Sequence, residues 1–135
     1  MSPVQETVLV VDDDAAVRAA LKFALEVEGF RVRLYDGPQA VLDDPELPKR
    51  ACMVVDYRMP RMDGIELVER LRARQVALPV ILISARVNPQ LHRLAEQTGL
   101  AGVLEKPLSG AALVDSIRSA LGPPVQHCLG DARPT

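Results

Sequence analysis

Short runs of β-branched and aliphatic residues alternate along this chain with segments in which apolar residues recur at helical spacing. Each run predicts a strand, and the five runs are Thr7–Val11, Arg31–Tyr35, Ala51–Val55, Pro79–Ile83 and Gly102–Glu105. A helical segment follows every run, with start signals at Asp14, Pro38, Gly64, Pro89 and Ser109. Parallel neighbouring strands need helical crossovers, so the pattern predicts an α/β fold, a doubly wound five-stranded parallel sheet flanked by five helices. The default strand order is 2-1-3-4-5.

The composition favours an aliphatic core in an intracellular protein. The 135 residues are 48% hydrophobic but only 3% aromatic, which suits a parallel sheet covered by helices. A formal net charge of −2 argues against nucleic acid as a direct partner. No apolar run approaches the roughly 20 residues that cross a bilayer, and no signal-peptide pattern precedes Thr7. The expected location is therefore the cytoplasm, with no membrane contact.

Residues 1–121 are predicted to form one domain, and residues 122–135 a flexible C-terminal tail. The tail contains three prolines and two glycines and has no helical period. No helix-turn-helix or basic region follows Leu121, so the expectation is a stand-alone domain that acts by contact with other proteins.

Polar residues follow the predicted strands at their carboxyl ends. These residues are Asp12, Asp13 and Asp14 after the first strand, Asp56 after the third, Ser84 after the fourth and Lys106 after the fifth. The four strands are consecutive neighbours in the order 2-1-3-4-5, so their end residues should converge. Close carboxylates repel one another unless a cation lies among them, and hard oxygen ligands suit Mg²⁺ or Mn²⁺. A lysine and a hydroxyl at the same crevice suit a phosphoryl group.

Each of these residues also has an ordinary explanation when taken alone. Asp14 is well placed as a helix N-cap, a lysine after a strand is usually a solvated charge, and Ser84 could form a turn. The joint pattern at successive strand ends is much harder to produce by accident, and it predicts a functional site.

Over about Thr7–Leu121, the sequence resembles the receiver domains of two-component response regulators. The resemblance is carried by four motifs, Val10–Asp14, Asp56–Gly64, Leu78–Ala85 and Glu105–Pro107. The tripeptides Arg58-Met59-Pro60 and Glu105-Lys106-Pro107 are most similar to those of the FixJ-type subgroup. The resemblance implies the flavodoxin-like fold of receivers and a phosphoacceptor rather than a turnover enzyme.

Roles for the site residues follow from the resemblance. Asp56 would accept a phosphoryl group from a sensor histidine kinase or a histidine phosphotransfer protein. Lys106 would pair with the phosphoryl oxygens, and Ser84 would hydrogen-bond the phosphoryl group once it has formed. The ligands of Mg²⁺ (or Mn²⁺) would be Asp12, chiefly through water, with Asp13, Asp56 and the backbone carbonyl of Arg58.

The resemblance also extends to the readout of the signal. A downstream protein would bind the face made by the fourth helix, the fifth strand and the fifth helix, and a homodimer is left open. The peptide bond between Lys106 and Pro107 would be cis. Arg58 and Arg86 would border the phosphoryl group and influence the access of water.

The sequence departs from the family three residues before Lys106, where receivers usually carry Tyr or Phe and this chain has Val103. The aromatic half of the usual switch should therefore be absent or muted. A phosphate-independent, receiver-like interaction module is accordingly the main alternative. A small phosphatase of the haloacid dehalogenase type is less favoured, because Ala15 and Ala16 follow Asp12-x-Asp14 where that motif needs Thr or Val.

Overall fold

All five predicted strands form and pair in parallel, in the order β2-β1-β3-β4-β5. A computed structural model describes residues 5–122. The strands are β1 (Thr7–Val11), β2 (Arg31–Tyr35), β3 (Cys52–Asp56), β4 (Val80–Ser84) and β5 (Gly102–Glu105). The helices are α1 (Ala15–Val27), α2 (Pro38–Leu42), α3 (Gly64–Ala73), α4 (Pro89–Thr98) and α5 (Gly110–Leu121). The predicted fold class and strand order are confirmed.

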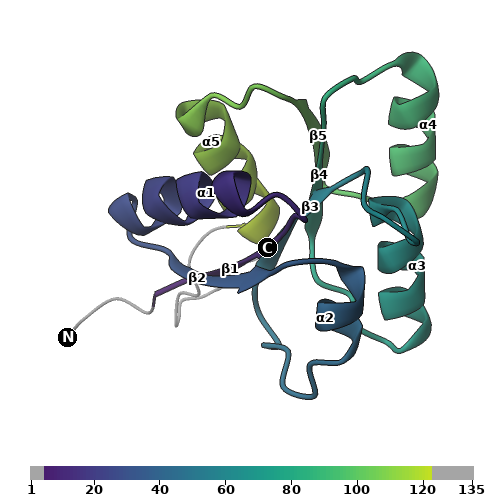
Figure 1. The fold of residues 1–135 in the computed structure, drawn as a ribbon, viewed down its shortest axis with the longest axis horizontal. Coiled ribbons are helices and arrows are strands. Elements are labelled where there is room, and N and C mark those ends of the chain that lie inside the picture. Colours follow the sequence, from purple (N-terminus) through teal and green to yellow (C-terminus); the bar gives the residue numbers. More distant parts are fainter. Residues whose placement is uncertain (1–4, 123–135) are drawn as a thin grey trace, which may run out of the picture.

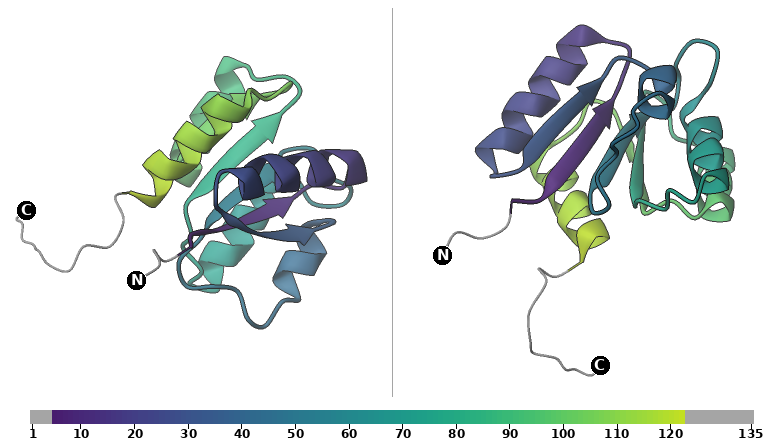
Figure 2. Two further views of the ribbon diagram at one scale, coloured as in Figure 1. Left: turned by 90° about the vertical axis from the view of Figure 1, so that its left-hand side faces the viewer. Right: turned by 90° about the horizontal axis from the view of Figure 1, so that it is seen from below.

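Helices cover both faces of the sheet (Figures 1 and 2). Alternate residues of a strand point to opposite faces, so Leu9 and Val11 pack with α2, α3 and α4, while Val8 and Val10 pack with α1 and α5. β3 and β4 are buried along their whole length, whereas the edge strands β2 and β5 are partly exposed. The two apolar layers fix the sheet between the helices and hold the strand ends in place.

β3 and β4 each begin and end one residue later than the sequence predicted. Asp56 pairs with Ile83, and Ser84 pairs with Glu105, so the parallel ladder continues through both polar residues. Asp56 and Ser84 are therefore the last residues of two central strands instead of the first residues of loops. Asp56 is held by β4 and Ser84 by β5, each on one side.

Side-chain caps begin four of the helices where the sequence predicted them. The oxygens of Asp14, Asp63, Asn88 and Ser109 each accept a hydrogen bond from a backbone N–H in the first turn of α1, α3, α4 and α5. Asp14 accepts from the N–H groups of Ala16 and Val17 at 2.8 and 3.3 Å. This acid therefore serves α1, which leaves Asp12 and Asp13 for the strand-end cluster.

Between residues 5 and 122, no helix combines the length and the apolar character that a membrane crossing requires. Of the predicted tail, residues 123–135 lie outside the described part of the chain. The boundary at residue 121 coincides with the end of α5, and the assignment of the two segments stays a prediction.

Candidate functional site at the strand ends

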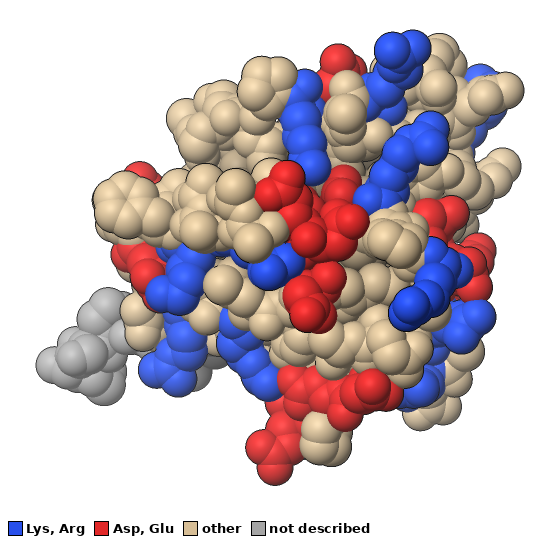
Figure 3. Space-filling view, in the orientation of Figure 1, with Lys and Arg blue, Asp and Glu red and all other residues tan. Residues whose placement is uncertain are grey.

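Three carboxylates meet where β1 and β3 end. One oxygen each from Asp12, Asp13 and Asp56 lie within 4.8 Å of one another. Asp12 is fully buried and Asp56 nearly so, whereas Asp13 is exposed. Figure 3 shows acidic side chains gathered near the middle of this face, with Lys and Arg side chains around them. The sequence prediction that these acids converge is confirmed.

Asp12 is held in place through its backbone and its side chain. Its N–H donates to the carbonyl of Tyr35 at 3.2 Å, and its Oδ1 accepts from the N–H of Asp14 at 2.9 Å. The Nη1 of Arg18, one turn into α1, donates to the Asp12 carbonyl at 2.7 Å. A buried carboxylate needs such partners, and these contacts fix its orientation toward Asp56.

Lys106 brings a positive charge to the acids from the end of β5. Its Nζ lies 3.4 Å from Oδ2 of Asp12 and 3.5 Å from Oδ1 of Asp56. The backbone N–H of Lys106 donates to the carbonyl of Ser84 at 2.8 Å, so the backbone of Lys106 is bonded to the end of β4. The peptide bond to Pro107 is cis, as the resemblance implied. One ammonium group thus bridges two buried carboxylates contributed by different strands.

The pKa values of Asp56 and Lys106 are both raised. Burial and the repulsion of Asp12 raise the pKa of Asp56, and the attraction of Lys106 offsets this only in part. Partial burial lowers the pKa of Lys106, but the attraction of Asp56 and Asp12 exceeds that effect and raises it. Lys106 has two anions beside it, whereas Asp56 has one cation and two anions. The cluster therefore retains an excess of negative charge that a further cation would relieve.

The acid cluster fits a small divalent cation. Its donors are hard carboxylate oxygens, and they lie close enough together to contribute to one coordination shell. Mg²⁺ keeps several waters when it binds, which suits a cluster with one exposed member, Asp13. Asp12, Asp13 and Asp56 would hold the ion. The role of the Arg58 carbonyl as a ligand stays a prediction.

Ser84 lies at the end of β4, beside Asp56, but its hydroxyl is turned to its own loop. The Oγ donates to the carbonyl of Arg86 at 3.0 Å and accepts from the N–H of Arg86 at 3.2 Å. One residue further on, the N–H of Val87 donates to Oε1 of Glu105 at 3.3 Å. Side-chain hydrogen bonds therefore hold the backbone of two adjacent residues in the loop after β4, Arg86 and Val87.

Three other predicted residues contribute no side chain to the acid cluster or to its ion pairs with Lys106. The side chains of Arg58 and Arg86 are exposed. Val103 is half-buried in β5 and packs against the core layer shared with α3 and α4. Because valine fills this place, no aromatic ring is available there to move inward.

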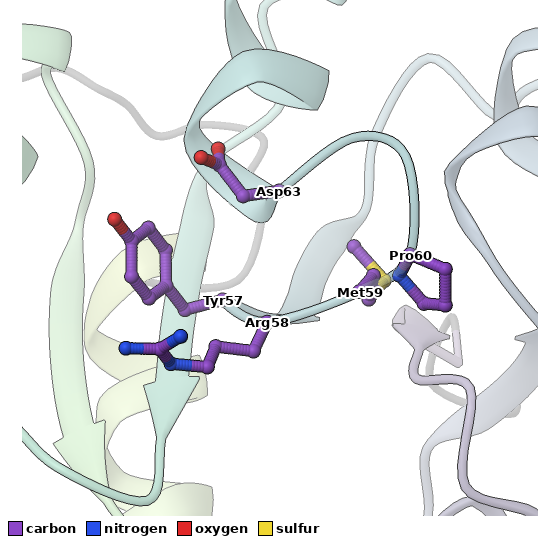
Figure 4. A pocket seen from close by; sticks show the side chains of 5 residues that line it. All are labelled: Tyr57, Arg58, Met59, Pro60 and Asp63. Atoms are coloured by element: carbon purple, nitrogen blue, oxygen red, sulfur yellow. The ribbon is translucent and has the colours of Figure 1, made fainter.

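The loop after β3 borders a shallow hollow of about 390 Å³ (Figure 4). Its lining residues are Tyr57, Arg58, Met59, Pro60 and Asp63, and Asp56 is not among them. Figure 4 shows Tyr57 and Arg58 projecting together, with Met59 and Pro60 further along the loop. The hollow lies beside the acid cluster, and no carboxylate of the cluster opens into it.

Sequence reasoning missed Arg18 and the structural role of Glu105. Arg18 follows Asp12 by six residues, a spacing that reaches back across the first turn of α1, so the sequence carried a usable signal. The Glu105 contact joins residues 18 positions apart, and it required the pairing of β4 with β5.

Comparisons with known proteins identify relatives of this arrangement. Residues 8–118 match the family described as "Response regulator receiver domain". The transcriptional regulatory protein FixJ of Bradyrhizobium diazoefficiens is 40% identical over 114 residues, covering 84% of this chain and 56% of that protein. FixJ of Azorhizobium caulinodans is 39% identical over 113 residues, covering 84% of this chain and 54% of that protein. The chain thus spans about half the length of these two relatives.

Solved structures agree with the sequence matches. A structure titled FixJ-N has a TM-score of 0.80 and 29% identity, and it covers 94% of this chain and 98% of its own. The response regulator StyR has a TM-score of 0.80 and 36% identity over 87% of this chain and 60% of its own. The chemotaxis protein CheY4 of Vibrio cholerae, at 22% identity and a TM-score of 0.81, shares the fold, with 87% of this chain and 100% of its own covered.

Proposed function

The chain belongs to the family of response regulator receiver domains, FixJ subgroup, and from that premise we propose that it accepts a phosphoryl group on Asp56. The observation that carries the proposal is the position of Lys106, whose Nζ lies within 3.5 Å of carboxylate oxygens of both Asp12 and Asp56. Phosphoryl transfer needs positioning and charge neutralisation more than covalent help. The buried acids and the lysine supply both.

In the proposed reaction, an oxygen of Asp56 attacks the phosphorus of a phosphohistidine on a histidine kinase or phosphotransfer protein. A phosphorus–oxygen bond forms, the phosphorus–nitrogen bond breaks, and the imidazole keeps the electron pair and takes a proton. Lys106 neutralises the oxygens of the transferred group, and Asp12, Asp13 and Asp56 would hold Mg²⁺. When bound, the ion would neutralise charge between the carboxylates and the phosphoryl oxygens. Asp56 is consumed as an acceptor, so the domain is not a turnover enzyme.

The proposed readout begins at Ser84. Its hydroxyl must release both bonds to Arg86 before it can reach a phosphoryl group on Asp56, and this frees the backbone of the loop that leads to α4. A downstream protein would bind α4, β5 and α5, where α4 exposes polar residues such as His92, Arg93 and Glu96. The relatives are about twice as long as the matched region, so the proposal concerns the receiver domain alone.

A phosphate-independent interaction module is the second candidate. The observation in its favour is Val103, which leaves the domain without an aromatic switch residue. The family match removes the reason to consider the phosphatase alternative.

The test is to incubate the protein with Mg²⁺ and acetyl phosphate and to look for an added phosphoryl mass. We expect an adduct on the wild-type chain, none on Asp56→Asn and none after the metal is chelated. Asp36→Asn is the matched control, because Asp36 is an exposed acid that directly follows β2 outside the cluster. An adduct that persists in Asp56→Asn, or the absence of any adduct on the wild type, contradicts the proposal.

A further inference from the structure

Arg18 contacts the acid cluster through the backbone and not through a carboxylate. It belongs to α1, which begins just beyond the end of β1 (Figure 1), and its Nη1 donates to the carbonyl of Asp12 at 2.7 Å. Its own N–H donates to the carbonyl of Asp14 at 3.0 Å. None of the ion pairs found within residues 5–122 includes Arg18. The described partner of this guanidinium is therefore a neutral peptide group.

The carbonyl that Arg18 holds belongs to the peptide unit that joins Asp12 to Asp13. A peptide unit is planar, so a hydrogen bond at its oxygen also restrains the nitrogen of Asp13. On the other side of Asp13, the next peptide unit is held at its N–H, the N–H of Asp14, which donates to Oδ1 of Asp12 at 2.9 Å. Both peptide units that flank Asp13 are therefore restrained, and together they fix the direction in which its side chain leaves the backbone.

Asp13 depends on this restraint more than the other two acids do. Asp12 and Asp56 are buried, so packing limits their side chains, whereas Asp13 is exposed. An oxygen of Asp13 nevertheless lies within 4.8 Å of an oxygen of each of the other two acids. Groups that orient a metal ligand without touching the metal typically change metal affinity by roughly 10–100-fold when they are removed. Of the two bonds that flank Asp13, the one from Arg18 comes from a side chain outside the acid cluster.

We propose that Arg18 is a positioning residue for the metal site: by holding the peptide unit between Asp12 and Asp13, it places the Asp13 carboxylate for a divalent cation. The inference rests on the metal site of the proposed function, but it does not require phosphoryl transfer. It also fixes a sign. Loss of the positive charge of Arg18 would by itself strengthen the attraction between the acids and a cation, whereas loss of positioning weakens metal binding. The two effects on metal affinity are opposite, so one measurement separates them.

Titration of the unphosphorylated full chain with Mn²⁺, followed by the electron paramagnetic resonance signal of the free ion, tests the proposal. We expect Arg18→Met, which removes both the donor and the charge, to bind Mn²⁺ about tenfold more weakly than the wild type. Arg18→Lys keeps the charge and a donor, so its affinity should lie between the two. Lys22→Met is the matched control, because it removes a positive charge from the same helix, where Lys22 pairs with Glu26 at 2.9 Å. Its affinity for Mn²⁺ should stay within about twofold of the wild type, since exposed charges are screened.

Mn²⁺ binding to Arg18→Met that is as tight as in the wild type, or tighter, overturns the proposal. Weaker binding to Arg18→Lys than to Arg18→Met also overturns it, because the charge would then outweigh the hydrogen bond. Circular dichroism checks that the variants are folded, and if Arg18→Met is not, the shorter and uncharged Arg18→Gln carries the same expectation. A wild-type chain that binds no Mn²⁺ overturns the metal site of the proposed function together with this role of Arg18. A wild type that binds Mn²⁺ but accepts no phosphoryl group contradicts the proposed function alone.

Discussion

Replacing Gly64 by alanine should destabilise the domain more than its position at a helix terminus suggests. Gly64 begins α3, and its N–H donates to the carbonyl of Tyr57 at 2.9 Å. A Cβ added there would lie 2.8 Å from the backbone oxygen of Asp56, 2.8 Å from Cδ1 of Leu82 and 3.0 Å from Cγ1 of Val55. Carbon atoms normally approach such neighbours no closer than roughly 3.5 Å, so α3 or its neighbours must shift.

The loss of unfolding free energy depends on how far the neighbours of the added Cβ can move. Leu82 and Val55 are fully buried, and Asp56 belongs to β3, which is paired on both sides by β1 and β4. Overpacking of a close-packed core typically costs about 1–3 kcal/mol, and three simultaneous contacts put this site near the upper end. Alanine also lowers the conformational entropy of the unfolded chain, which raises the unfolding free energy by about 0.4–1 kcal/mol. The net loss should be about 2–2.5 kcal/mol, or roughly 6–12 °C in melting temperature for a domain of this size.

Urea unfolding measures this loss, and Gly110→Ala is the matched control. Gly110 also begins a helix, α5, but a Cβ there would meet nothing within 4 Å. Gly110→Ala should be neutral or stabilising by about 0.5 kcal/mol. Displacement of α3 would also move the backbone of Asp56, so phosphorylation of Gly64→Ala by acetyl phosphate should be slower. If the two alanine variants unfold within about 0.5 kcal/mol of each other, the packing argument is refuted.

Three further outcomes follow from the site and from one strained residue. The pKa of Asp56 in the folded state is raised above 3.8. Between pH 3.8 and the raised pKa, the folded state therefore binds more protons at Asp56 than the unfolded state does. The unfolding free energy without Mg²⁺ should consequently fall as the pH rises through this range. Urea midpoints across that range should show a smaller fall in Asp56→Asn. Lys106→Met leaves two buried carboxylates without their cation, so it should lower the unfolding free energy without Mg²⁺ by about 2–3 kcal/mol. Added Mg²⁺ should restore part of this loss in the same urea assay. Gln75 has a φ of 66° just after α3, so Gln75→Gly should raise the unfolding free energy by about 0.5–1 kcal/mol, whereas Gln75→Ala should not.

The strand ends were predictable because each one carries its own local signal. An apolar run that stops at Asp12 or Asp56 shows where a strand ends, and the common order of doubly wound sheets supplied the order 2-1-3-4-5 that the structure confirms. Convergence of the acids then follows from topology alone. The sequence therefore predicted both the fold and the members of the acid cluster.

The direction of the Ser84 hydroxyl was not predictable in the same way. A serine at a strand end can bond forward to a ligand or back to its own loop, and the choice depends on the backbone path of Ala85 and Arg86. Here that path brings the N–H and the carbonyl of Arg86 to within 3.0–3.2 Å of the Oγ. The pattern of residue types places the hydroxyl near Asp56, but it does not set the hydroxyl's partner.

The absence of an aromatic ring at Val103 does not leave the loop after β4 uncoupled from β5. Glu105 is two residues further along β5, and its carboxylate accepts from the N–H of Val87, next to the residue that holds Ser84. If Ser84 turns toward a phosphoryl group as proposed, the N–H and the carbonyl of Arg86 lose their bonds to its hydroxyl, while the bond from Val87 to Glu105 still joins this segment to β5. The proposed signal would then pass to the start of α4 through the backbone of Arg86 and Val87. Such a route needs no large side chain to move through the core, which is consistent with a valine at position 103.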